Sequence, residues 1–89
     1  MEAKPFDTTD LGLAAALVAR GFSIDKLTMA VETRRTLFVF REDDDAEAMR
    51  EESNQFFNNR LSVDALAYWQ AIRALKARLH ELRKAHGLN

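Results

Sequence analysis

The spacing of hydrophobic residues changes twice along this chain, and each change limits the fold. Over residues 11–18 they recur at i, i+3, i+4 and i+7, the spacing of one helix face. Over 27–31 they alternate with polar or small residues, and 37–40 is apolar at every position. Alternation indicates a strand with one wet face, and a short continuous run indicates a strand covered on both sides. After residue 44 the helical spacing returns.

Each expected helix has residues nearby that could satisfy the free backbone groups at its ends. Short polar side chains accept the N–H groups of a first turn, and glycine adopts the left-handed conformation that ends a helix. An acid followed three residues later by glutamate imitates a capping box. The expected helices are 8–20 with Asp7 or Thr8 as cap and Gly21 as stop, a second from Asp44 with Glu47 to Asn58-Asn59, and 63–85 with Ser62 as cap, assisted by Asp64, ending at Gly87.

The sequence therefore predicts an α+β domain in the order α-β-β-α-α. A β-hairpin, turned at the polar residues 32–35, would be packed by three helices, the last being the longest. Residues 1–6 are expected to form a mobile arm, and residues 7–89 a single domain. A chain of 89 residues buries only about 60% of its unfolded surface, so its stability margin is thin.

The long helix carries two neighbouring stripes. One is apolar, in steps of four, three, four and three, which is the spacing of a core or of a partner helix: Tyr68, Ile72, Leu75, Leu79 and Leu82. The other places an aromatic residue ahead of cations, which is how single-stranded nucleic acid is held. The residues of this second stripe are Trp69, Arg73, Lys76, His80, Arg83 and Lys84. The plainer interpretation, a solvated helix face whose cations suit the C-terminal dipole, is preferred.

An acidic segment has the opposite charge. It comprises Glu42, Asp43, Asp44, Asp45, Glu47, Glu51 and Glu52, relieved only by Arg50. A calcium-binding loop would need glycine at its sixth position and glutamate at its twelfth. Counted from Asp43, those positions hold Ala48 and Asn54, which excludes this kind of site. The acids either cap a helix or imitate nucleic-acid phosphate for a basic partner.

No catalytic constellation is present in the sequence. The absence of cysteine excludes disulfides, thiolate zinc sites and cysteine nucleophiles. His80 and His86 are six residues apart, which does not place both on one side of a helix, and no glycine-rich loop or Gly-x-Ser-x-Gly elbow occurs. We expect a protein without enzymatic activity, metal or cofactor. No secretory signal or membrane-spanning run is recognised, so we expect a soluble, cytoplasmic protein.

Three stretches together resemble a known family. They are "TTDLGLAAALVARGF", "RTLFVF" followed by acidic residues, and "NNRLSVDALAYWQAIRALKARL". They are similar to the small bacterial family called domain of unknown function 5659, over about residues 7–79. The resemblance implies the same element order and a setting in bacteria, phages and mobile elements. It implies no catalytic residue, because the family has no assigned activity.

The leading hypothesis is a non-enzymatic binding protein that docks on another macromolecule through the acidic segment, and a protein partner is favoured over nucleic acid. A nucleic-acid mimic or anti-defence inhibitor would be one form of it. The alternative is a nucleic-acid-binding accessory or regulatory protein that uses the basic stripe of the last helix. A formal net charge of −1 gives no overall basic character in its favour. A homodimer is also expected, through either the sheet edge or the apolar helix stripe.

Overall fold

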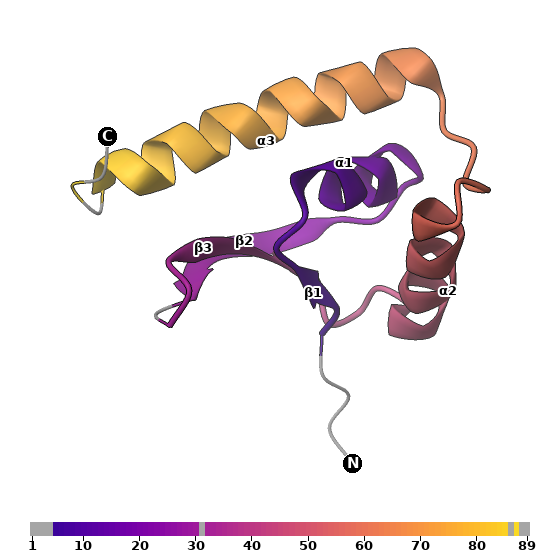
Figure 1. Ribbon diagram of the computed structural model, residues 1–89, viewed down its shortest axis with the longest axis horizontal. Coiled ribbons are helices and arrows are strands. Elements are labelled where there is room, and N and C mark those ends of the chain that lie inside the picture. Colours follow the sequence, from indigo (N-terminus) through magenta and orange to yellow (C-terminus); the bar gives the residue numbers. More distant parts are fainter. Residues whose placement is uncertain (1–4, 31, 86, 88–89) are drawn as a thin grey trace.

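The protein folds into a small antiparallel sheet covered by helices, as seen in a computed structural model that describes residues 5–30, 32–85 and 87 (Figure 1). The strand order in the sheet is β1-β3-β2. The expected α+β fold with a long C-terminal helix is confirmed. Its elements are β1 (Asp7–Thr8), α1 (Leu11–Ala19), β2 (Ile24–Ala30), β3 (Arg35–Phe40), α2 (Ala46–Phe57) and α3 (Ala65–Ala85).

The sheet has one strand more than the expected hairpin. The additional strand is β1, in which Thr8 pairs with Phe38 of β3. Beside this pair, the N–H group of Phe40 donates to the carbonyl of Phe6 at 2.9 Å. The ring of Phe6 also packs edge-on against Phe40, at 6.0 Å between centroids. Residues 1–4 of the expected arm lie outside the described residues, whereas Phe6 belongs to the packed domain.

The first helix cap was predicted at the wrong residue. Asp7 and Thr8 are occupied in the sheet, so neither caps α1. Asp10 does so instead, and its Oδ1 accepts the N–H group of Leu13 at 2.9 Å. The hydroxyl of Thr8 accepts the N–H group of Asp10, which fixes the chain between strand and helix.

The caps of the other two helices lie close to the predicted residues but not at them. Asp45, not Asp44, caps α2 and accepts the N–H group of Ala48 at 3.1 Å. At the start of α3, the carboxylate of Asp64 accepts the N–H group of Ala67 at 2.9 Å, so the expected cap at Ser62 is wrong. The carbonyl of Ser62 instead accepts a hydrogen bond from Arg20. At Asp44 a long-range contact accounts for the difference, because its carboxylate accepts the N–H group of Ser23.

Helix α1 lies at the centre of the molecule, between the sheet and α3 (Figure 1). Five consecutive residues, 13–17, are buried, although the periodicity predicted only one buried face. Small side chains permit this close packing. A Cβ atom at Gly12 would lie 3.4 Å from the hydroxyl of Tyr68 in α3 and 3.5 Å from the ring of Phe56 in α2.

The apolar stripe of α3 is used inside the chain. Tyr68, Ile72 and Leu75 pack into the core with α1, and Leu75 is 3% exposed. The C-terminal half of α3 extends past α1 and lies over the sheet (Figure 1). The stripe is therefore a core face over its first three members, whereas Leu79 and Leu82 are half-buried and each line a hollow beside the helix.

Candidate macromolecule-binding surfaces

The second stripe of α3 faces solvent. We call the side chains of Trp69, Arg73, Lys76, His80, Arg83 and Lys84 the basic surface; all six are exposed. Trp69 is 57% exposed, so more than half of its surface is accessible to solvent. Leu66, one turn earlier on the same helix, is 62% exposed and continues the apolar end of the surface. The first stripe holds the helix in place while the second presents an aromatic ring and cations.

The fold adds arginines to this surface from elsewhere in the sequence. Arg34 and Arg35, at the turn between β2 and β3, line a pocket of about 230 Å³ together with Arg83 of α3. The pocket is completed by Thr9, Leu11, Thr36, Phe38 and Leu79. None of its lining residues is acidic. The sequence had indicated only a polar turn at these positions, and nothing local connects them to a residue almost fifty positions later.

The turn that carries these arginines has a defined backbone. Arg34 adopts a left-handed conformation with φ 56°, and its N–H group donates to the carbonyl of Ala30 at 2.8 Å. The N–H group of Arg35 donates to the hydroxyl of Thr33 at 3.3 Å. A left-handed conformation is uncommon for a long side chain and is easier for glycine or asparagine. Asn59, the other described non-glycine residue with positive φ, is of the easier kind.

Most side chains of the acidic segment already have partners within the protein. Asp43 pairs with Arg41, Glu47 with Arg50, and Glu52 with Arg20, the residue that follows α1. The other two partnered acids, Asp44 and Asp45, accept backbone N–H groups. Glu42 and Glu51 are exposed. Residues 41–52 contain seven carboxylates and two arginines, so this part of the chain keeps a net negative charge in spite of these bonds.

Among the ion pairs in the described part of the chain, that of Arg41 and Asp43 has clearly shifted pKa values. Nε and Nη2 of Arg41 lie 3.0 and 3.2 Å from the two carboxylate oxygens of Asp43. This hydrogen bonding from Arg41, with a further bond from the backbone, lowers the pKa of Asp43 below its ordinary value. The same contact raises the pKa of Arg41. Both side chains are exposed, so the pair is a surface ion pair.

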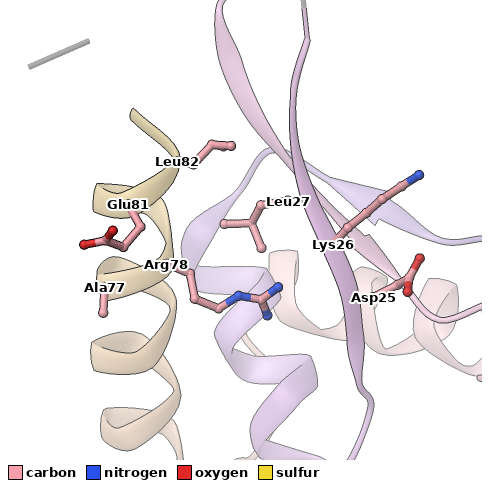
Figure 2. Close-up of a pocket in the computed structure, with 7 residues that line it drawn as sticks. All are labelled: Asp25, Lys26, Leu27, Ala77, Arg78, Glu81 and Leu82. Atoms are coloured by element: carbon pink, nitrogen blue, oxygen red, sulfur yellow. The ribbon is translucent and has the colours of Figure 1, made fainter. Parts of the chain in front are cut away.

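Two further hollows carry charges of both signs. Beside the acidic segment, a groove of about 460 Å³ is lined by Arg41, Glu42 and Asp43 with residues 24–25. A larger groove, of about 560 Å³, separates β2 from the C-terminal half of α3. Figure 2 shows Leu27 and Arg78 directed into this space, whereas Lys26 points away from α3. Neither groove has the single charge sign found at the pocket of Arg34, Arg35 and Arg83.

The described part of the chain has neither a cluster of metal-binding side chains nor a membrane-spanning helix. Residues 5–30, 32–85 and 87 hold no group of three or more histidine, cysteine or acidic side chains that could bind a metal ion. Within the same residues, no helix combines the length and apolar character needed to cross a membrane. The acidic side chains of residues 42–52 therefore form no metal cluster in this arrangement.

Comparison with known proteins places the chain in a family. A family model described as a domain of unknown function, DUF5659, matches residues 3–81. The chain belongs to this family. No curated protein and no solved structure matches it. The resemblance noted from the sequence is thereby confirmed, over a slightly longer range than expected.

The DUF5659 match covers nearly all of the features described above. It includes the turn with Arg34 and Arg35, the acidic segment and α3 as far as Glu81. Arg83 and Lys84, at the C-terminal end of the basic surface, lie beyond it. The family description names no ligand or activity, so the functional assignment of this DUF5659 domain depends on its geometry and charge.

Proposed function

We propose that this DUF5659 domain is a non-enzymatic binding protein that docks on single-stranded nucleic acid through the basic surface of α3. The observation that carries the proposal is the exposure of Trp69 at the start of a row of cations. Arg73 lies four residues after Trp69, one turn along the helix. None of the cations of the basic surface forms an ion pair with another residue in the described part of the chain.

The chemistry of single-strand binding needs both features. Aromatic side chains stack on bases without regard to sequence, and cations neutralise the phosphates between them. From Trp69 to Arg83 the helix rises about 21 Å, which at about 3.4 Å for each stacked nucleotide corresponds to roughly six nucleotides. Helix α3 packs on α1 with its N-terminal half and lies over the sheet with its C-terminal half, so it supplies a platform of this length (Figure 1).

Most of the acidic side chains are bonded within the described part of the protein and the cations of the basic surface are not, which favours the basic surface over the acidic segment as the docking surface. Five of the seven acids accept a hydrogen bond inside the protein. An acid that must give up an internal partner in order to bind an external one gains less free energy from the exchange. The cations of the basic surface, by comparison, are solvated, and binding would release counterions from the nucleic acid.

Fluorescence of the chain's single tryptophan tests the proposal directly. An unlabelled single-stranded dodecamer, titrated at low and moderate salt, should quench Trp69 if its bases stack there. The logarithm of the binding constant should fall with the logarithm of salt concentration, with a slope of about −0.7 for each phosphate neutralised. A slope of zero, or no binding at low salt, would contradict the proposal.

Two aromatic variants, followed by the anisotropy of a labelled strand, form a matched test. Trp69→Ala should weaken binding by about 1–3 kcal/mol, the usual contribution of one stacked base. Phe57→Ala removes an aromatic side chain of similar exposure, 59%, that lies at the end of α2 and outside the basic surface. Its affinity should equal that of the unaltered protein. Equal losses in the two variants would mean that the ring of Trp69 has no particular role.

The acidic segment supports a second candidate, docking on a basic protein as an inhibitor or nucleic-acid mimic. The observation in its favour is the groove beside Glu42 and Asp43, where two of these acids and Asp25 outnumber Arg41. Changing Asp43, Asp44 and Asp45 to Asn should abolish capture of a protein partner from lysate. Since Asp45 also caps α2, Glu42→Gln with Glu51→Gln is the better variant for a folded comparison. Capture of the same partners by this variant would exclude the mechanism.

Three finer points belong to the same proposal. The protein would act in the cytoplasm, be carried by a phage or mobile element, and form a homodimer. The origin is suggested by the family resemblance, and the cytoplasm by the lack of cysteine. For the dimer, Tyr68, Ile72 and Leu75 of the apolar stripe already pack into the core, which favours a sheet edge such as that of β2.

A further inference from the structure

We infer that the pocket lined by Arg34, Arg35 and Arg83 binds a phosphate group, and that its ligand is the terminal phosphate of a nucleic-acid strand lying along α3. The inference rests on the proposed function for the identity of the ligand. The site itself is defined by the pocket, which joins the β2–β3 turn to the last turns of α3. Figure 1 shows these two parts on the same side of the molecule, away from α2.

The lining of the pocket selects an anion. Three of its eight residues are arginines, two are threonines with hydroxyl donors, and none is acidic. Arginine is the side chain that suits phosphate best, because its planar group donates two parallel hydrogen bonds. The groove on the other side of α3 differs, since Asp25 and Glu81 there balance Lys26 and Arg78. The pocket of Arg34, Arg35 and Arg83 therefore has a net positive lining, whereas the groove between β2 and α3 has no net charge.

The charge of the pocket favours a strand end over a phosphate within a strand. An internal phosphate carries one negative charge and is flanked by sugars on both sides. A terminal phosphate carries about −1.5 to −2 charges at neutral pH, as a phosphomonoester does, and only one side of it is occupied by a sugar, so it suits a pocket lined by three arginines better. A pocket of about 230 Å³ at one end of the basic surface, with Trp69 at the other, suits a short strand bound end-on.

The backbone of the turn gives an independent reason to attribute a role to Arg34. This residue is held at φ 56°, where glycine would be under no strain. An arginine is therefore present at a position whose conformation disfavours it. Arg34→Gly should leave the fold at least as stable and remove one guanidinium from the pocket, so a functional loss in this variant would not come from unfolding.

The test compares one eight-nucleotide strand with a 5′-phosphate, with a 3′-phosphate and with hydroxyl groups at both ends, by quenching of Trp69. One phosphorylated strand should bind at least tenfold more tightly than the hydroxyl strand at low salt. Arg34→Gly and Arg83→Gln should each reduce this ratio several-fold. Arg78→Gln, which removes an exposed arginine of the same helix from the opposite groove, should leave the ratio unchanged. Millimolar inorganic phosphate should weaken the binding of the phosphorylated strand and leave the binding of the hydroxyl strand unchanged.

The outcomes separate the inference from the proposed function. If all three strands bind equally, the terminal-phosphate site is wrong while single-strand binding stands. If no strand binds, the proposed function is wrong, and the ligand inferred here is wrong with it. A titration with inorganic phosphate, followed by NMR of the arginine Nε–H groups, then decides whether the pocket is a phosphate site for a free ligand. Absence of shifts at Arg34, Arg35 and Arg83 would overturn the site altogether.

Discussion

At the scale of single residues, adjacent acids with the same side chain have different roles. Asp43 pairs with Arg41, Asp44 accepts the N–H group of Ser23, and Asp45 caps α2. The sequence left open whether the acidic segment caps a helix or imitates nucleic-acid phosphate for a basic partner. In the structure, these three aspartates hold the loop between β3 and α2 through separate contacts. Glu42 and Glu51 are the exposed acids that remain to face a partner.

Removing the partner of Asp43 should restore its ordinary ionisation. In Arg41→Gln we expect the pKa of Asp43 to rise toward 3.8, because the hydrogen bonds that stabilise its carboxylate are lost. Carboxyl ¹³C chemical shifts followed against pH measure this. Arg50→Gln removes an arginine that pairs with Glu47 and should leave the titration of Asp43 unchanged. An unaltered pKa in Arg41→Gln would contradict the assigned cause.

The sign of the linked effect on stability follows from the direction of this shift. The pKa of Asp43 is lower in the folded protein than in the unfolded chain, so the pair favours folding above about pH 4. That contribution is lost as the pH falls through the lowered pKa of the folded state. Because both side chains are exposed, the loss should be small compared with the stability of the domain.

At the scale of elements, the beginnings of the helices are set by aspartates that lie one residue before the first helical turn. Asp10, Asp45 and Asp64 immediately precede α1, α2 and α3. Their carboxylates accept N–H groups that would otherwise be unsatisfied, and their negative charge suits the helix N-terminus. All three helices thus share one device, which differs from the mixture of caps that the sequence suggested.

The corrected cap of α3 can be tested against the predicted one. Asp64→Ala should lower the free energy of unfolding by about 0.5–2 kcal/mol through loss of the bond to Ala67. Ser62→Ala should change it by less than about 0.5 kcal/mol, because Ser62 is exposed and takes part through its carbonyl group. Urea denaturation followed by circular dichroism measures both. A larger cost for Ser62→Ala than for Asp64→Ala would restore the predicted cap.

At the scale of the whole molecule, charge is separated along the fold. The acidic segment lies at α2 and the loop before it, whereas the arginines of the β2–β3 turn and the end of α3 lie on the opposite side (Figure 1). Between residues 69 and 84 there are five cations and one carboxylate. A net charge near zero therefore conceals two oppositely charged regions, each able to attract a different partner.

The longer of the two edge strands, β2, leads to a prediction about assembly. Strand β2 is paired only with β3, and after the irregularity between Ile24 and Lys26 its register is regular to Ala30. A second copy could extend the sheet there, because an edge strand presents unpaired backbone groups. Sedimentation equilibrium at micromolar concentration should then give about twice the chain mass of 10.2 kDa. A mass of one chain at all concentrations would contradict the dimer.

The sequence by itself determined the features that depend on neighbours within one or two turns. The change of hydrophobic period located the helices and the two longer strands, and steps of four and three identified the buried stripe of α3. The exposed stripe with Trp69 followed from the same spacing. Such features are readable because side chains three or four residues apart share a helix face whatever the rest of the chain does.

Only the tertiary structure decided which of several similar residues has each role. Strand β1 exists because β3 offers it an edge, and this pairing moved the first cap from Thr8 to Asp10. Arg20 and Glu52 form an ion pair although 32 positions separate them. The pocket of Arg34, Arg35 and Arg83 exists because α3 passes over the sheet beside the turn. Local patterns carry no information about such meetings, since they depend on how the chain reverses direction and which surfaces it buries.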